Sequence, residues 1–375
     1  MSEPNRTLGI LGAKAFFDVS MFETEQRVIG QRCWALLGPA DWVSHDGAWM
    51  TGRIADREVF VQRFGERLVG FENVCSHRFS ELRNARRGSG AIQCPYHGWM
   101  FNAEGTPVGI PHCRQMFGVA PHQLANRRLR PIAVAKNGEF VFGRLSPPVS
   151  ESHNDGLGRW ASLFAALDGR SLELFGDHEQ VIRANWKLGF ENTLDEYHIV
   201  AVHPKSFGSG GWLAPGQYLY EQDGSNAAML LKRSGIQSID AAELIRAISA
   251  GEPLPVDYAI FHFFPDFLIG FVAGRVVMVT RYEAIAVNET RVRTLLFDML
   301  PPQGASLNAL KRQAVSGYIG TVLEEDREAV ERWNRGRRQA WGAPLHGLQE
   351  QRLGHFERSW ASLFAPTEIA GALQS

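Results

Sequence analysis

Two short pairs of cysteine and histidine constrain this chain more than any other feature of its sequence. One residue separates Cys75 from His77, two residues separate Cys94 from His97, and sixteen residues lie between the two pairs. Thiolate sulfur and imidazole nitrogen are strong ligands of transition metals, so these four side chains predict a metal centre. The fold must therefore bring two separate segments of the chain to one site.

The sequence around the two pairs reads as short β-strands joined by turns. Strand-like residues 59–61 and 68–71 flank a glycine-containing turn, and Asn137-Gly138 is a strong hairpin signal. Each Cys/His pair is then expected at the tip of its own loop in a β-rich domain. Two interpretations remain open at this point. The four ligands could hold one tetrahedral zinc, or they could divide between the two irons of a Rieske [2Fe–2S] cluster, thiolates on one and imidazoles on the other.

The amino-acid sequences of the two loops resemble those of a known family. The run C-P-Y-H-G-W at residues 94–99 resembles the second cluster motif of the Rieske non-haem iron oxygenases, and C-S-H-R at 75–78 resembles the first. The resemblance favours the cluster over zinc and implies that the two cysteines and two histidines named above are its ligands. Respiratory Rieske proteins carry a further cysteine near each pair, which this chain does not. Cys33 and Cys113 are expected to be buried, inert thiols.

A second candidate metal site follows about 100 residues later, where the chain contains D-x-x-H-x4-H. The sequence predicts a helix over about 184–202, on which Asn192, Asp195 and His198 share one face. His203 can converge with His198 on one metal if the helix ends just before the proline that follows. Two imidazoles and a carboxylate on one face of a metal, with the remaining positions open, form the site of non-haem Fe(II) oxygenases.

This stretch also resembles the iron-binding helix of the same oxygenase family, which implies His198 and His203 as ligands of a mononuclear Fe(II). The resemblance further implies a carboxylate ligand from a C-terminal helix. Asp326 fits that pattern best in the acidic run Glu324-Glu325-Asp326, and Glu325 is the next candidate.

Asp195 and Asn192 receive other roles. The resemblance implies that Asp195 hydrogen-bonds an iron-ligating histidine and also a cluster-ligating histidine of the neighbouring subunit, so that it bridges two redox centres. A carboxylate in that position fixes the tautomer and basicity of an imidazole. Asn192 either approaches the iron or serves as a structural amide on the helix face.

The order of elements predicts the fold class. Strand-like runs followed and surrounded by helical stretches are typical of an α+β protein. We expect an N-terminal β-rich Rieske [2Fe–2S] domain and a C-terminal α+β catalytic domain, in which helices cover an antiparallel sheet. The expected boundaries are a helical extension over 1–30, the Rieske domain over 31–146 and the catalytic domain over 147–375.

Charge and hydropathy exclude several other classes of protein. The 39 basic and 40 acidic residues give a net charge of −1, which offers no general attraction for nucleic acid or an anionic membrane. No stretch approaches the ~18 apolar residues of a membrane span, and the N-terminus lacks the pattern of a signal peptide. Four cysteines do not form a disulfide framework. We therefore expect a soluble, cytoplasmic protein.

The resemblance implies the terminal oxygenase of a multicomponent system that uses O₂ and a small organic substrate. Electrons would come from NAD(P)H through a separate reductase, with or without a ferredoxin, because the chain contains no flavin or nucleotide fingerprint. We expect a head-to-tail homotrimer. A Rieske electron carrier without oxygenase activity is the rival from another class, and D-x-x-H-x4-H argues against it.

Substrate and docking surfaces are less constrained. Residues 261–264 and 267–269 suit an apolar or aromatic pocket, although an aromatic core explains them equally well. Mono- or dihydroxylation of an aromatic compound is the favoured reaction, and demethylation or hydroxylation of a quaternary amine or methoxy compound is the alternative. The arginine-rich stretch 83–88 is either a solvated loop or a basic rim for an acidic electron donor.

Overall fold

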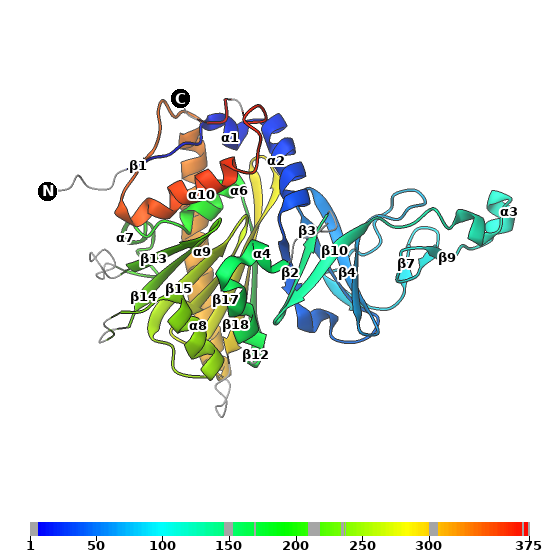
Figure 1. The fold of residues 1–375 in the computed structure, drawn as a ribbon, viewed down its shortest axis with the longest axis horizontal. Helices are drawn as coiled ribbons and strands as arrows, with labels where there is room; N and C mark the ends of the chain where they lie inside the picture. The colour runs from blue at the N-terminus through cyan, green and yellow to red at the C-terminus, as the bar shows by residue number, and fades with distance from the viewer. Residues whose placement is uncertain are drawn as a thin grey trace. The chain divides into compact units, whose positions relative to one another are not determined.

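The structure, a computed structural model, separates the chain into two compact units. The β unit comprises Gly30–Asp155, and the α+β unit comprises Met1–Ile29 together with Gly156–Ser375 (Figure 1). The predicted domain boundary at 146 and 147 lies outside the described residues. The residues described are 7–145, 153–168, 170–208, 218–233, 236, 238–299, 307–369 and 371–373.

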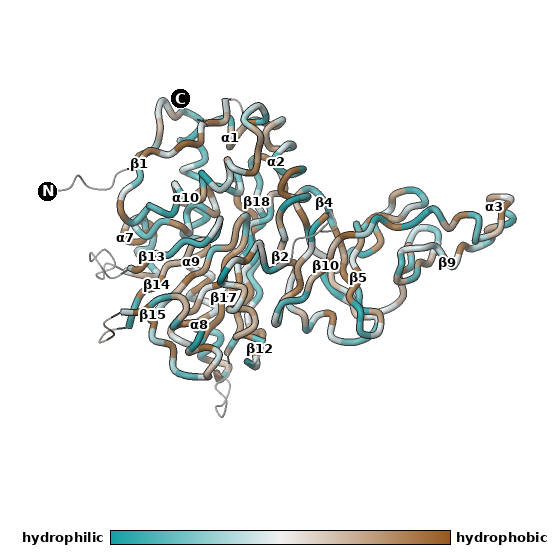
Figure 2. The backbone as a smooth tube through the Cα atoms, in the orientation of Figure 1, coloured by the Kyte–Doolittle hydropathy of each residue, from teal (hydrophilic) through white to brown (hydrophobic). Residues whose placement is uncertain are grey.

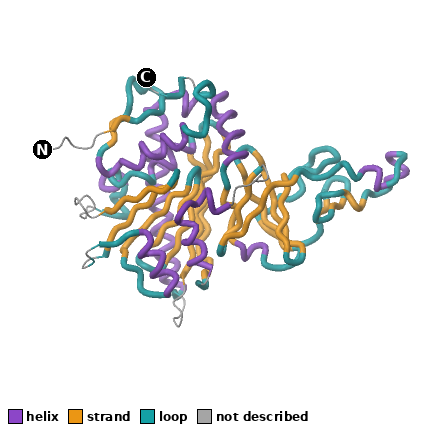
Figure 3. Tube along the Cα trace, viewed as in Figure 1, coloured by secondary structure: helices purple, strands orange, loops and turns teal. Residues whose placement is uncertain are grey.

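The β unit contains a seven-stranded antiparallel sheet in the order β2-β11-β10-β5-β4-β3-β6 and a three-stranded sheet in the order β7-β8-β9. Figure 3 shows how much of this unit is strand and loop. Its elements are β2 Ala35–Pro39, η1 Ala40–Val43, β3 Ala48–Ile54, β4 Arg57–Phe64, β5 Arg67–Glu72, β6 Arg87–Ser89, β7 Ile92–Gln93, β8 Met100–Phe101, β9 Pro107–Gly109, α3 Cys113–Phe117, η2 Pro121–Leu124, β10 Pro131–Asn137 and β11 Phe140–Arg144.

Two tight hairpins in the β unit follow the sequence prediction closely. Phe64 pairs with Arg67 across a two-residue turn that begins at Gly65. The second turn lies one residue later than predicted, because Asn137 still pairs with its partner strand and the turn begins at Gly138. Both glycines have a φ of 54°, a conformation that side chains with a Cβ rarely adopt.

The α+β unit is built on a seven-stranded antiparallel sheet in the order β12-β18-β17-β16-β15-β14-β13, which confirms the predicted fold class. Every neighbouring pair in this sheet runs antiparallel. Its strands are β12 Leu172–Ile182, β13 Tyr218–Asp223, β14 Asn226–Lys232, β15 Val256–Phe263, β16 Phe267–Val272, β17 Val276–Ala286 and β18 Glu289–Met299, and β1 Thr7–Leu8 pairs with β19 Leu345–His346 in a separate ribbon.

Helices cover both faces of the sheet in the α+β unit, and Figure 2 shows hydrophobic stretches along its strands. On one face, Phe261 packs against Trp160 with 5.4 Å between ring centroids, and Phe263 packs against Phe164 at 5.2 Å. The long helix α9, orange in Figure 1, lies against the other face, where Ile319 joins Val276 and Leu296 in a buried cluster. The helices are α1 Ala13–Phe17, α2 Val19–Arg32, α4 His153–Leu157, η3 Gly158–Trp160, α5 Ala161–Asp168, α6 Trp186–Asn192, α7 Ile199–Val202, α8 Ala241–Ala250, α9 Ala309–Arg337, η4 Leu348–Glu350 and α10 Gln351–Ala361.

The continuous helix predicted over 184–202 is wrong. Helix α6 ends at Asn192, helix α7 starts at Ile199, and a turn connects them. Polar side chains in the turn bond to the local backbone and compete with the helix. Thr193 donates to the Phe190 carbonyl at 2.6 Å, and the Asp195 carboxylate accepts the Tyr197 N–H at 2.5 Å.

Helix α6 is anchored by a buried ion pair that the sequence did not predict. The ammonium of Lys187 donates to Glu25 on α2 at 2.6 Å, and both side chains are fully buried. The same carboxylate accepts N–H bonds from Trp186 and from Trp360 on α10. One carboxylate therefore ties α2, α6 and α10 together. In the part of the chain that the structure describes, no helix is both long enough and apolar enough to span a bilayer.

Candidate active site

The first Cys/His pair lies in a compact loop closed by its own backbone. The N–H of Cys75 donates to the Ser80 carbonyl at 2.8 Å, and the N–H of Phe79 donates to the Cys75 carbonyl at 3.0 Å. Phe79 has a φ of 62°, which turns the chain back after the histidine. These bonds fix the backbone on both sides of His77.

The second pair repeats this geometry. The N–H of Cys94 donates to the Trp99 carbonyl at 2.8 Å, and the N–H of Gly98 donates to the Cys94 carbonyl at 3.0 Å. Gly98 has a φ of 72° and occupies the position that Phe79 occupies in the first loop. The two loops thus present their cysteines in equivalent positions.

The loops bring the four predicted cluster ligands together, with both cysteines buried, His77 half-buried and His97 exposed. The rings of His77 and His97 meet edge to face at 4.7 Å, and Trp99 stacks on His77 at 4.7 Å. Burial and the neighbouring Cys94 thiol raise the pKa of Cys75 to about 11. His77 Nδ1 is buried and has no hydrogen-bond partner among the described residues, as expected of an atom placed to bind a metal.

The arrangement of these four side chains distinguishes between the two interpretations of the sequence. A single tetrahedral zinc requires all four ligand atoms around one point. Among the described residues, one group of three or more His, Cys, Asp or Glu side chains converges closely enough for one ion, and it contains none of these four. The donor set of two thiols and two imidazoles at separate loop tips instead fits a cluster with two irons.

The group that does converge is His198, His203 and Asp326, whose ligand atoms lie within 4.8 Å of one another. Asp326 Oδ1 is 3.2 Å from His203 Nε2 and 3.6 Å from His198 Nε2. His198 immediately precedes α7 and His203 immediately follows it, so the four-residue helix α7 sets their separation. Asp326 comes from α9. Two imidazoles and a carboxylate with open space beside them suit a mononuclear iron.

The structure places the two acidic candidates differently. Glu325 Oε2 lies 3.1 Å from His203 Nδ1, on the side of the ring away from Asp326. Glu325 also accepts the backbone N–H of Lys205 at 3.0 Å and the hydroxyl of Ser206 at 2.5 Å. It therefore orients the histidine and is not part of the converging group.

Asn192 and Asp195 contact this group from outside it. Asn192 donates to Asp326 Oδ1 at 2.8 Å, so its amide holds the carboxylate in place. Asp195 Oδ2 lies 3.4 Å from His198 Nδ1, the ring nitrogen that faces away from Asp326. Asp195 is not a member of the converging triad.

The electrostatics of the triad favour a cation. Burial by itself would raise the pKa of Asp326, but hydrogen bonds from His198 and His203 outweigh it and hold the value at about 2. Burial lowers the pKa of His198, yet the carboxylates of Asp195 and Asp326 raise it to about 10. A bound metal ion would replace the proton on this imidazole as the positive charge between the carboxylates.

A buried network that the sequence did not reveal supports the turn between α6 and α7. Arg352 on α10 is fully buried and bonds both Glu196 and His262 Nδ1. His262 Nε2 lies 3.0 Å from the hydroxyl of Thr193. Burial is the main cause that lowers the pKa of His262, so its ring is neutral and can accept from Arg352 while donating to Thr193. In the sequence, Arg352 looks like an ordinary charged residue of an amphipathic helix, so its place in this network was not predicted.

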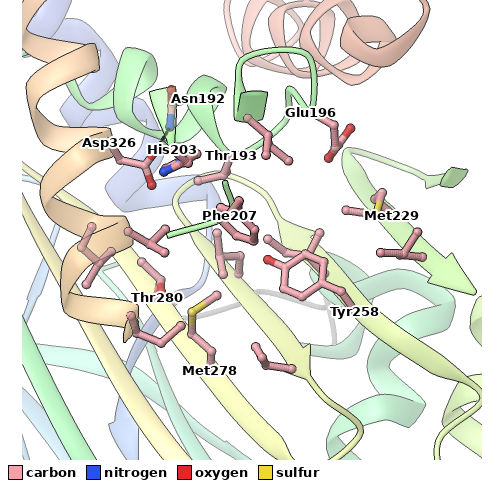
Figure 4. Close-up of a pocket in the computed structure, with 18 of the residues that line it drawn as sticks. Asn192, Thr193, Glu196, His203, Phe207, Met229, Tyr258, Met278, Thr280 and Asp326 are labelled. Atoms are coloured by element: carbon pink, nitrogen blue, oxygen red, sulfur yellow. Dashed lines mark hydrogen bonds and ion pairs between the residues drawn. The ribbon is translucent and has the colours of Figure 1, made fainter. Parts of the chain in front are cut away.

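A cavity of about 280 Å³ opens beside the triad (Figure 4). Its walls are largely apolar and come mainly from the sheet face under α9 and from α9 itself. Of the aromatic runs 261–264 and 267–269, only Leu268 lines it, whereas Phe261 and Phe263 belong to the core on the opposite face. The other lining residues include Phe207, Tyr218, Met229, Leu231, Tyr258, Ile260, Val272, Met278, Thr280, Tyr282 and Val322.

The arginine-rich stretch 83–88 is partly structural. The guanidinium of Arg83 lies 4.6 Å from the ring of Trp49 and donates to Gln62 at 2.9 Å. Burial lowers the pKa of Arg83 to about 10. Arg83 therefore supports the fold of the β unit instead of forming part of a solvated basic rim.

Comparison with known families agrees with both metal sites. Residues 169–365 match the model of the ring hydroxylating alpha subunit (catalytic domain), and residues 33–126 match that of the Rieske [2Fe-2S] domain. The first match contains the His198, His203 and Asp326 triad, and the second contains all four predicted cluster ligands.

Curated proteins and a solved structure are similar over different lengths. The N,N-dimethyl phenylurea N-demethylase subunit alpha of Sphingobium sp. strain YBL2 is 30% identical over 52% of this chain and 44% of its own. The large oxygenase component of the naphthalene 1,2-dioxygenase system of Pseudomonas aeruginosa is 29% identical over 59% and 49%. The chain therefore spans about half the length of the curated relatives it matches. A quaternary ammonium Rieske monooxygenase with L-carnitine has the same fold, with a TM-score of 0.78, 18% identity and 97% of both chains covered.

Proposed function

The chain belongs to the Rieske non-haem iron oxygenase alpha subunits, and from this premise we propose that it is the terminal oxygenase of a multicomponent system. The observation that carries the proposal is the His198, His203 and Asp326 triad at the wall of an apolar cavity. An electron carrier of the Rieske type needs no such site. The triad therefore favours an enzyme that inserts oxygen from O₂ into an organic substrate.

We assign the ligands as follows. Cys75, His77, Cys94 and His97 would hold the [2Fe–2S] cluster, and the triad would hold Fe(II). When bound, the cluster supplies electrons and the mononuclear iron supplies the site at which O₂ is reduced.

The remaining residues of the site would position these ligands and the substrate. Glu325 holds His203 by its outer nitrogen, and Asn192 holds the carboxylate of Asp326, so both ligands keep one orientation. The apolar cavity walls would exclude water and orient a small molecule with the reacting carbon toward the triad.

Metal content tests this proposal most directly. Protein purified anaerobically should contain about three irons and two acid-labile sulfides per chain, two irons in the cluster and one at the triad. Substrate-dependent O₂ uptake with a surrogate reductase would then identify the reaction. Zinc without sulfide would contradict the proposal.

We propose that electrons arrive from NAD(P)H through a separate reductase, with or without a ferredoxin, and that the protein forms a homotrimer. Within the trimer, Asp195 would bridge His198 to His97 of the neighbouring subunit. The position of Asp195 supports this role, because one oxygen lies 3.4 Å from His198 Nδ1 and the side chain is 17% exposed.

Asp195→Asn tests the bridge, because it keeps the size of the side chain but removes its charge. Both metal centres should remain and the reductase should still reduce the cluster, yet single-turnover reoxidation of the cluster with substrate and O₂ should collapse. Wild-type reoxidation and product formation would rule the bridge out. Loss of iron would instead identify Asp195 as a ligand.

The favoured reaction is mono- or dihydroxylation of a small aromatic compound, which the apolar cavity walls support. Oxidation or demethylation of a quaternary amine is a second candidate. Tyr218, Tyr258 and Phe207 line the cavity and could attract a cation with their ring faces, and Asp257 also lies at its edge. A screen of O₂ uptake with aromatic and quaternary ammonium compounds would separate the two.

A further inference from the structure

Tyr258 carries a hydroxyl group in the cavity wall that takes no part in holding the fold together, and Tyr282 and Tyr318 also line this cavity. Tyr258 lies on β15 and lines the cavity, and Figure 4 shows its hydroxyl directed into the open space. No described residue forms a hydrogen bond with this hydroxyl. Tyr258 is half-buried, and its hydroxyl faces the cavity, so its polar partner must come from whatever occupies the cavity.

Two nearby hydroxyl groups differ from that of Tyr258, because each bonds to another residue of the protein. Tyr220 donates its hydroxyl to Glu196 at 2.9 Å, and that bond forms part of the network with Arg352. Thr280 also lines the cavity, and its hydroxyl bonds Thr294 at 2.8 Å. These groups stabilise the protein itself. The Tyr258 hydroxyl is available to a ligand.

The surroundings keep this hydroxyl in its neutral form. Burial raises the pKa of Tyr258, and the negative charges of Glu196 and Asp326 raise it further. A neutral phenol donates a hydrogen bond readily to a carbonyl or ether oxygen. Because the walls around it are apolar, such a bond would be the main polar contact of a ligand on this side of the cavity.

We propose that the Tyr258 hydroxyl donates a hydrogen bond to an acceptor atom of the substrate. The substrate is then a small, largely apolar molecule with a carbonyl or ether oxygen, and not a bare hydrocarbon. This inference rests on the proposed function, because it takes the cavity beside the triad as the substrate site. The bond to Tyr258 fixes one end of the molecule and leaves the other to face the triad.

The size of the cavity agrees with this class of substrate. Ligand pockets commonly measure ~300 to ~1,000 Å³, and the volume of about 280 Å³ lies just below that range. A single ring with one short substituent is of the right size. In a cavity this small, one directional bond can determine which end of the ligand faces the triad.

Pairs of compounds that differ in one acceptor atom test the proposal. Acetophenone is compared with α-methylstyrene, and anisole is compared with ethylbenzene, by anaerobic equilibrium dialysis against the holoenzyme so that no turnover occurs. A neutral hydrogen bond predicts about 3- to 10-fold tighter binding of the oxygen-bearing member of each pair. Tyr258→Phe should abolish this preference by weakening only the oxygen-bearing compounds.

Two further variants control for indirect effects. Tyr220→Phe removes a hydroxyl that is already bonded to Glu196, so the preference should persist. Tyr282 also lines the cavity, and loss of the preference in Tyr282→Phe but not in Tyr258→Phe would overturn the assignment. Equal binding within each pair, or no binding of either oxygen-bearing compound, would also overturn it. Iron and sulfide content test the proposed function separately, because they require no substrate.

Discussion

The two metal sites of this chain are built in opposite ways. Each cluster loop closes through backbone bonds between residues four and five positions apart, as in Cys75 with Phe79 and Ser80. The triad instead joins His198 and His203 to Asp326, more than 120 residues later on another helix. One site depends on local loop geometry and the other depends on the packing of the whole α+β unit.

This difference predicts which mutations should disrupt each site. A local loop tolerates change elsewhere, because the bonds that shape it lie within it. A site assembled from distant elements depends on whatever holds those elements together, such as the Lys187 and Glu25 pair beneath α6. Mutations remote from the metal should therefore affect the triad more than the cluster loops.

The largest expected effect follows from removing one ligand at each site. Asp326→Ala should lose the mononuclear iron and all measurable substrate oxidation, while the visible spectrum of the cluster remains. Cys94→Ser should abolish that spectrum. Iron analysis and absorbance spectra of the purified variants check both results. Retention of the third iron and turnover by Asp326→Ala would show that another acid holds the metal.

The next effect concerns stability. Lys187→Met leaves the fully buried carboxylate of Glu25 without its cation, which should lower the free energy of unfolding of the α+β unit by about 3 to 5 kcal/mol. Denaturant unfolding followed by tryptophan fluorescence measures the change. The double variant Glu25→Gln/Lys187→Met removes both charges and should recover part of the loss. Equal stability of the wild type and Lys187→Met would mean that the pair does not anchor α6.

Sequence reasoning was most successful where structure is local. The hairpins and the pairing of metal-binding residue types follow from neighbouring residues, and the fold class follows from the order of the predicted elements. The continuous helix over 184–202 failed because Thr193 and Asp195 bond to nearby backbone groups, which helical periodicity does not register. The role of Arg352 could not be predicted, because its partners, Glu196 and His262, are far from it in the sequence.

The acidic run on α9 shows the same limit at the scale of one residue. The family resemblance favoured Asp326 over Glu325, but the helical pattern alone fits either acid. In the structure, Glu325 faces the outer nitrogen of His203 and Asp326 faces the inner one. Only the direction of α9 relative to α7 distinguishes them, and no local pattern encodes that direction.

Glu325→Gln sharpens this distinction. The variant keeps the size of the side chain but weakens its hold on His203 Nδ1, so iron affinity at the triad should fall about 10- to 100-fold without loss of the site. Iron titration of the metal-depleted protein measures the affinity. Glu324→Gln is the matched control, because Glu324 pairs with Arg327 at the surface and should leave the affinity unchanged. Complete loss of iron binding in Glu325→Gln would show that it is itself a ligand.

The smallest expected effect tests whether the cluster loops are as self-contained as their geometry indicates. Phe79 and Gly98 occupy equivalent positions with φ values of 62° and 72°, and the ring of Phe79 is 77% exposed. This conformation carries a steric penalty of about 1 to 2 kcal/mol for a residue with a Cβ. Glycine avoids that penalty, but fixing its backbone on folding costs about 0.5 to 1 kcal/mol in chain entropy. Phe79→Gly should therefore stabilise the β unit by about 0.5 kcal/mol, and Gly98→Ala should destabilise it by about 1 kcal/mol. Unfolding midpoints of the two variants measure the difference. Destabilisation by Phe79→Gly would mean that contacts of the phenylalanine ring, and not backbone geometry alone, hold the first loop in place.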